Sequence, residues 1–132
     1  MKQEEIQQAV MQMRYLEQQI GYVQQQMTAF NNVLVELEAT VVALNAMKEM
    51  KEDTNAMSPI GSGVYATSVL KKSDNVLFEV GAGMSVEKPI DEVLSLISER
   101  KKNTEGQITK MTNTASELEN QYVKLAESVR GN

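Results

Sequence analysis

The chain has 132 residues, and its 13 basic against 18 acidic residues give a net charge of −5. It contains no Cys and no His, which excludes a disulfide framework and the commonest catalytic nucleophile and base pairs. The acidic balance opposes the electrostatic attraction that dominates nucleic-acid binding, and two Phe with nine Met favour a narrow helical seam over a large globular core.

The sequence predicts no targeting or membrane segment. No apolar run approaches the roughly 18 residues of a membrane span, and the N-terminal MKQEEIQQ has acids and glutamines where a signal peptide needs apolar residues. We therefore expect a cytoplasmic protein without a membrane partner.

Residues 1–54 are predicted to form a long helix with a seven-residue repeat, abcdefg, in which Ile6 is position a. The a and d columns are apolar: Ile6, Met13, Ile20, Met27, Leu34 and Val41 at a, and Ala9, Leu16, Val23, Phe30, Leu37 and Leu44 at d. Such a repeat keeps a narrow apolar seam facing a partner helix, as in coiled coils. Lys48 and Lys51 occupy the next a and d positions, so the seam ends there.

Residues 55–88 are predicted to form two small β-hairpins. Residues 64–70 and 76–80 are rich in β-branched and aromatic residues, and they flank the polar KKSDN segment, whose composition fits a hairpin loop. Residues 84–87 form a further short strand whose expected partner is 76–80. Residues 57–60 form a fourth, which Pro59 confines to a sheet edge.

Residues 89–132 are predicted to form a second helix that begins at Pro89. One column holds Ile90, Ile97, Thr104, Met111, Leu118 and Leu125, and the other holds Leu94, Lys101, Ile108, Ala115, Tyr122 and Val129. Lys101 and Thr104 interrupt the seam, either to set its register or as a locally solvated stretch. The two seams are about equally long, so an antiparallel coiled coil within one α+β domain, residues 1–132, buries both.

The predicted hairpins require other subunits. Isolated hairpins are marginal in water, and these strands carry apolar side chains that little else in the chain can cover. The residues expected at subunit contacts are Val64, Tyr65, Val69, Val76, Phe78 and Val80. We expect several copies to join their hairpins into a closed barrel, with the coiled coils projecting from it.

The far ends of the helices carry apolar side chains beside the seam in glutamine-rich surroundings. Soft Met and aliphatic side chains suit adaptable contact with unfolded chains, although scattered apolar residues at frayed helix ends are equally compatible with the composition. The candidate binding residues are Ile6, Ala9, Val10, Met11, Met13, Tyr122, Val123, Leu125, Ala126 and Val129. No catalytic site, cofactor site or metal site is predicted, so we expect a binding protein and not an enzyme.

The complete pattern resembles the alpha-class subunit of prefoldin, of archaeal type. The resemblance rests on PIGSG at residues 59–63, NVLFEVGAGMSVEKP at 75–89 and IDEV at 90–93, between two heptad helices. It implies a hexamer of two alpha-class and four beta-class subunits with a β-barrel platform. It also implies capture of unfolded protein at the arm tips without ATP, and delivery to a group II chaperonin.

A second function stays open beside this chaperone. The same hairpins could drive growth of a filament in which the arms only space the copies, and the family includes a variant that assembles with itself alone. A nucleic-acid-binding arm is a third class, which the charge balance opposes.

Overall fold

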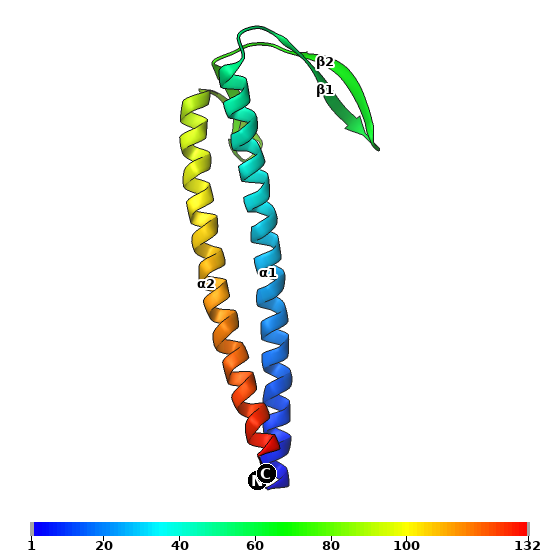
Figure 1. The fold of residues 1–132 in the computed structure, drawn as a ribbon, viewed down its shortest axis with the longest axis vertical. Helices are drawn as coiled ribbons and strands as arrows, with labels where there is room; N and C mark the ends of the chain where they lie inside the picture. Colours follow the sequence, from blue (N-terminus) through cyan, green and yellow to red (C-terminus); the bar gives the residue numbers. More distant parts are fainter. Residues whose placement is uncertain (1, 132) are drawn as a thin grey trace. The chain divides into compact units, whose positions relative to one another are not determined.

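The computed structural model describes residues 2–131. Its elements in chain order are α1 (Gln3–Glu49), β1 (Thr54–Gly61), β2 (Val64–Leu70), β3 (Asn75–Gly81), β4 (Met84–Pro89) and α2 (Ile90–Arg130). Figure 1 labels both helices and the first hairpin. The two long helices and two small antiparallel hairpins confirm the predicted fold class. The residues divide into two compact units. We call residues 2–35 with 102–131 the arm unit, and residues 36–101 the hairpin unit.

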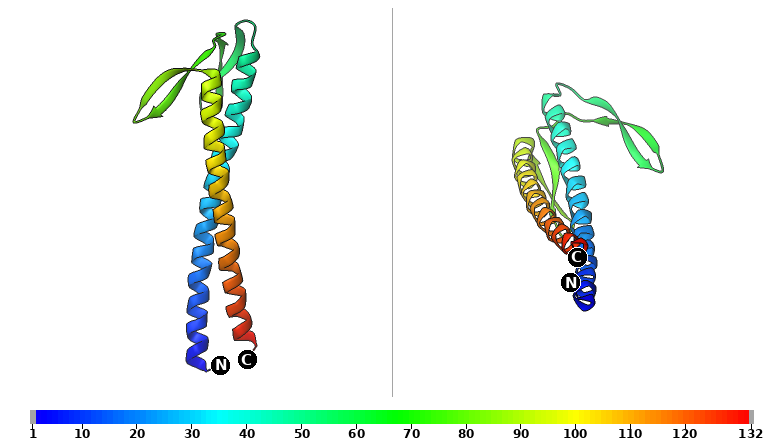
Figure 2. Two further views of the ribbon diagram at one scale, coloured as in Figure 1. Left: turned by 90° about the vertical axis from the view of Figure 1, so that its left-hand side faces the viewer. Right: turned by 60° about the horizontal axis from the view of Figure 1, so that its bottom comes forward.

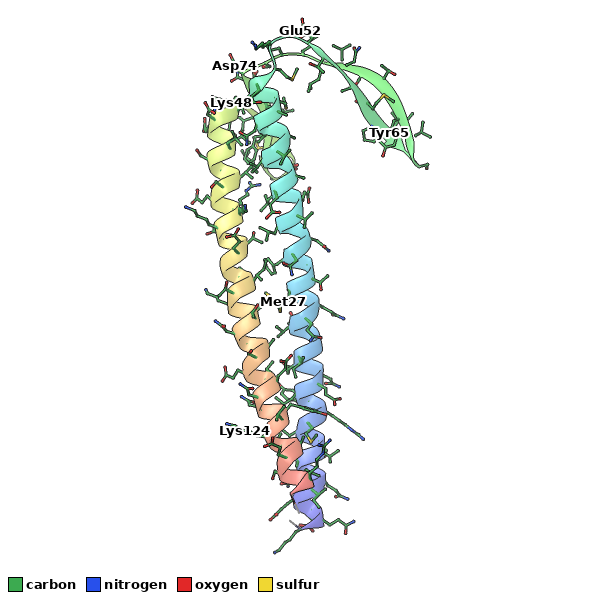
Figure 3. All side chains as sticks on the ribbon, in the orientation of Figure 1. Met27, Lys48, Glu52, Tyr65, Asp74 and Lys124 are labelled. Atoms are coloured by element: carbon green, nitrogen blue, oxygen red, sulfur yellow. The ribbon has the colours of Figure 1, made fainter. Side chains whose placement is uncertain are left out.

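The arm unit consists of the first part of α1 and the last part of α2, which run side by side in opposite directions (Figure 2). The first turns of α1 and the last turns of α2 lie together at one end. Met27 lies between the two helical segments (Figure 3), and Ala9, Leu16, Thr104 and Ala115 are buried. The remaining seam residues of this unit are half-buried, which confirms the predicted heptad register.

The core of the hairpin unit is a small cluster at the ends of both helices. Its buried members are Leu37, Leu44, Ile90, Val93 and Ile97, and half-buried Val41, Met47 and Leu94 pack against it. The cluster extends the predicted seam by Val93 and Met47, which lie outside the a and d columns. Val76 and Phe78 of β3 also pack against it, so the hairpin β3–β4 is fixed to the chain's own helices.

Each hairpin closes at a two-residue turn with the backbone in the left-handed region. Ser62 and Gly63 have φ of 51° and 77°, and Ala82 and Gly83 have φ of 52° and 72°. Positive φ at both central residues is the type I′ geometry, whose twist matches the flanking strands. The sequence places these turns at GSG and GAG, with an irregularity of register just before each turn.

The predicted hairpin between residues 64–70 and 76–80 is wrong. Strand β2 pairs with β1 and strand β3 pairs with β4, in two separate two-stranded sheets. The KKSDN segment instead connects the two hairpins. Two hydrogen bonds hold it in place: the Lys72 backbone amide donates to the side-chain Oδ1 of Asp53 at 2.8 Å, and the Ile90 backbone amide donates to the Asp74 carbonyl oxygen at 2.9 Å. The pairing of residues 76–80 with 84–87 is confirmed, and residues 57–60 lie in β1 as predicted.

Two of the ion pairs in the hairpin unit join α1 to α2, and a third, between Lys88 and Glu92, joins β4 to the first turn of α2. Lys48 Nζ lies 2.6 Å from Oδ1 of Asp91 in the first turn of α2, and Asp74 lies close to this pair (Figure 3). Lys101, which interrupts the predicted seam, lies 3.8 Å from Glu38 Oε1 of α1. Both pairs are largely exposed, so each contributes little to stability. Lys101 is thus partly solvated and paired, while Thr104 in the arm unit is buried.

Helix α1 is more apolar than the sequence analysis implied. By length and composition alone it could cross a membrane, because it holds an 18-residue window with mean hydropathy 1.3. The seam residues Leu34, Leu37, Val41 and Leu44 contribute to the apolar content of this helix, as a coiled-coil core requires. Val35 and Val42, which are exposed, add to it.

Candidate functional site

The hairpin β1–β2 offers an uncharged surface for subunit contacts. No charged residue occurs from Thr54 to Leu70, and its large apolar side chains are exposed: Met57, Ile60, Val64, Tyr65, Val69 and Leu70. Native proteins protect sheet edges with charged residues, short strands or a covering element. Within the hairpin itself, Ser58 and Ser68 share a side-chain hydrogen bond of 2.8 Å. The surface of this hairpin is therefore uncharged and largely apolar, and none of these protections is present between Thr54 and Leu70 apart from Pro59.

The hairpin β3–β4 differs, because part of its apolar surface is already used. Val76 and Phe78, which the sequence analysis placed among the subunit contacts, pack against the core cluster of their own chain. The Arg100 guanidinium lies over the Phe78 ring at 4.9 Å from its centroid, within the range of a cation–π contact. Leu77 and Val80 point into solvent, with exposed fractions of 74% and 52%. Among the described residues, Val80 is the only predicted subunit-contact residue of this hairpin that does not pack against the chain's own core cluster.

The predicted binding residues at the helix ends fall into two groups. Met11 and Val123 are exposed, whereas the others are half-buried or buried within the arm unit: Ile6, Ala9, Val10, Met13, Tyr122, Leu125, Ala126 and Val129. Most of the predicted set therefore also holds the two helical segments together. Contact between these half-buried residues and another chain would require the helix ends to separate locally.

A polar contact crosses the arm unit beside these residues. The Tyr122 hydroxyl donates to Glu17 Oε1 at 2.9 Å, joining α2 to α1. This hydrogen bond, together with the nearby Glu17 charge and some desolvation, raises the pKa of Tyr122 above its ordinary value of 10.0, because all three favour the neutral phenol. Tyr122 thus links the two helices at neutral pH.

The sequence analysis missed Tyr15 and Tyr22, which are exposed aromatic residues on α1 in the arm unit. Gln8, Met11, Gln12 and Tyr15 line a shallow hollow of about 430 Å³ on the same helix. Tyr15 and Tyr22 both occupy position c of the heptad, opposite the seam, and this position was the signal that could have found them. Among residues 2–131, no group of three or more His, Cys, Asp or Glu is arranged to hold a metal ion.

Comparisons with known proteins found a matching family and a matching fold for this chain of two heptad helices and two hairpins. The sequence model of the family described as prefoldin subunit matches residues 16–131. The chain belongs to the prefoldin family. Two similar relatives are named prefoldin subunit alpha. That of Methanobrevibacter smithii is 28% identical over 109 residues, 83% of this chain and 74% of the relative. The relative from Pyrococcus horikoshii is 28% identical over 112 residues, which are 84% of this chain and 76% of the relative.

The fold agrees with a solved prefoldin structure. Filamentous PFD from Methanocaldococcus jannaschii, determined by cryo-electron microscopy, has a TM-score of 0.73 and 21% sequence identity to this chain. The likeness covers 96% of this chain and 99% of that one. Prefoldins are chaperones that work as oligomers of several subunits, so this member of the family is a chaperone subunit.

Proposed function

We propose that this prefoldin subunit captures unfolded polypeptide at the ends of its helices, without ATP, and passes it to a group II chaperonin in the cytoplasm. The observation that carries the proposal is the division of exposed apolar surface between the two units. Tyr65 and Val69 are exposed on the hairpin β1–β2, to which we assign assembly, and Met11 and Val123 are exposed on the arm unit, to which we assign client binding. Assembly with beta-class subunits, in a hexamer of two alpha-class and four beta-class chains, presents several arms to one client. Many weak contacts then act together.

Truncation of the helix ends tests this function. A variant that lacks the residues before Met13 and after Leu118 loses Met11 and Val123 but retains both hairpins and the core cluster of the hairpin unit. We expect the assembly to survive, while suppression of aggregation of a chemically unfolded test protein falls sharply. Addition of ATP should change neither result. If the truncated assembly protects the test protein as well as the full-length one, the helix ends do not bind clients.

A filament-forming scaffold is the second candidate. It is favoured by the uncharged β1–β2 hairpin, which could pair with another copy of the same chain, and the similar solved structure is of a filamentous prefoldin. A closed hexamer has a fixed mass, whereas an open filament grows with concentration. Mass measured by light scattering, with and without a beta-class subunit, separates the two. Growth without limit in the presence of the beta-class subunit would favour the scaffold.

A further inference from the structure

Helix α1 carries a second regular row of side chains in the arm unit, on the side opposite the seam. The row occupies positions c and f of successive heptads and consists of Gln8, Met11, Tyr15, Gln18, Tyr22 and Gln25. Alternating steps of three and four residues place these side chains along one face of the helix. We call this face the outer row. Met11, Tyr15 and Tyr22 have exposed fractions of 70%, 59% and 61%, so three large side chains with apolar surface stand in solvent along this row.

The outer row contains no charged residue, which is unusual for an exposed helix face. Arg14 lies beside the row, and the carboxylate of Glu17 accepts the hydrogen bond from Tyr122 of α2. After Glu17, α1 has no charged residue before Glu36. The segment of α2 in the same unit is different, since it exposes many charges: Lys102, Glu105, Lys110, Glu117, Glu119, Lys124, Glu127 and Arg130. The lack of charge is therefore specific to the outer row and to residues 18–35 of α1, and it does not extend to α2.

The chemistry of the outer row fits an extended chain better than a second helix. A packed helix satisfies its own backbone hydrogen bonds, so glutamine amides buried against it would lose water and gain few partners. An extended segment of unfolded protein has unpaired backbone N–H and C=O groups. Gln8 of the row and Gln12 beside it can donate to and accept from these groups, while Met11 and Tyr15, which line the same hollow, contact apolar side chains.

The length of the outer row sets the size of the segment. From Gln8 to Gln25 it extends about 26 Å along the helix at 1.5 Å per residue, which is the length of about eight residues of extended chain. We propose that the outer row binds extended, uncharged segments of unfolded protein that are rich in apolar side chains. This inference rests on the proposed client-binding function. It extends the client-binding surface from the helix ends to the outer row of α1.

The test compares two sets of substitutions on the same helix in the assembled protein. The row variant combines Met11→Gln, Tyr15→Gln and Tyr22→Gln, and the control combines Val33→Gln, Val35→Gln and Val42→Gln, whose side chains are also exposed. Glutamine is at least as good a helix former as the residues it replaces other than Met, and far-UV circular dichroism checks the helix content. The single change Tyr22→Gln, far from the helix end, serves as a milder second variant.

The probe is a fluorescently labelled peptide of about ten residues, made of Leu, Phe, Ser and Gly, and binding is measured by fluorescence anisotropy. We expect the row variant to raise the Kd roughly tenfold, Tyr22→Gln to raise it several-fold, and the control to change it less than about twofold. Raising the salt concentration should leave the affinity nearly unchanged, because no charge on the row takes part. Replacing half of the apolar residues in the peptide with Glu should abolish binding.

The outcomes separate this inference from the function on which it rests. If the unsubstituted assembly binds neither the peptide nor an unfolded test protein, the proposed function fails and the inference fails with it. If the unsubstituted assembly binds and the row variant binds equally well, only the outer-row site is overturned. A smaller mass of the row variant by light scattering would show that the row pairs copies of the chain, which also overturns an unfolded chain as its occupant.

Discussion

Replacing Leu44 with Ala should destabilise the hairpin unit strongly, because Leu44 is one of the buried residues of its core. Its exposed fraction is 6%, and it belongs to the same cluster as Ile90, Val93 and Ile97. Leu→Ala at buried positions costs about 2 to 5 kcal/mol, depending on how far the surroundings can fill the space. Half-buried Val41 and Met47 border this small cluster and can move towards the gap. We therefore expect a loss of about 3 kcal/mol, in the lower half of that range.

Urea unfolding followed by circular dichroism at the helix band measures this loss. With a slope of about 1.5 kcal/mol per molar urea, typical of small proteins, the midpoint should fall by about 2 M. The protomer concentration must be equal in all samples, since assembly stabilises the folded state. Val42→Ala is the matched control: Val42 lies two residues away on the same helix with an exposed fraction of 70%, so its change should stay within about 0.5 kcal/mol. If both variants unfold at the same urea concentration, the core cluster does not hold the unit together.

Four further substitutions test the turns, the hairpins and the contact between the helices. Gly63→Val places a β-branched residue at φ of 77°, which should cost about 1 to 2 kcal/mol locally and speed amide hydrogen exchange in β1 and β2; exchange as slow as before would contradict the turn geometry. Phe78→Asp should detach β3–β4 from the core and lower the thermal midpoint, whereas Val80→Asp should leave the midpoint unchanged but reduce the assembled mass in light scattering. An intact assembly with Val80→Asp would remove that residue from the subunit contacts. Because the folded state raises the pKa of Tyr122 above 10.0, the stabilisation is complete below the unfolded-state pKa and is lost as pH rises through the folded-state pKa. As pH rises into the alkaline range, the thermal midpoint of the Tyr122→Phe variant should therefore fall less than the midpoint of the unsubstituted protein. An equal fall in both proteins would show that the phenol does not contribute to stability.

The regular features of this protein could be predicted because each depends on residues close together in the sequence. The seam depends on a repeat of seven residues, and the a and d columns of both helices are at least half-buried as expected. The start of α2 was predicted one residue early, at Pro89, which is the last residue of β4; α2 begins at Ile90, with Asp91 and Glu92 in its first turn as expected. Strand β2 was predicted with both of its ends correct, Val64–Leu70.

Strand pairing was the main error, because β2 could pair with the strand before it or with the strand after it. Residues 64–70 have polar turn-forming residues on both sides, GSG before them and KKSDN after them. The shorter turn prevailed, since Ser62 and Gly63 adopt the left-handed conformation that a two-residue hairpin needs. KKSDN offers no glycine for such a turn, and it became the connection between two hairpins.

The sequence by itself determined the two apolar seams, the positions of the glycine turns and the absence of charge from β1–β2 and from one face of α1. Only the tertiary structure decided which apolar residues stay exposed. Phe78 and Val80 lie on the same strand, yet Phe78 packs against the helices of its own chain and Val80 does not. Val10 and Met11 are neighbours, yet only Met11 is largely exposed. Local periodicity fixes the face on which a side chain lies, but burial depends on which other element packs there, and that packing joins residues far apart in the chain.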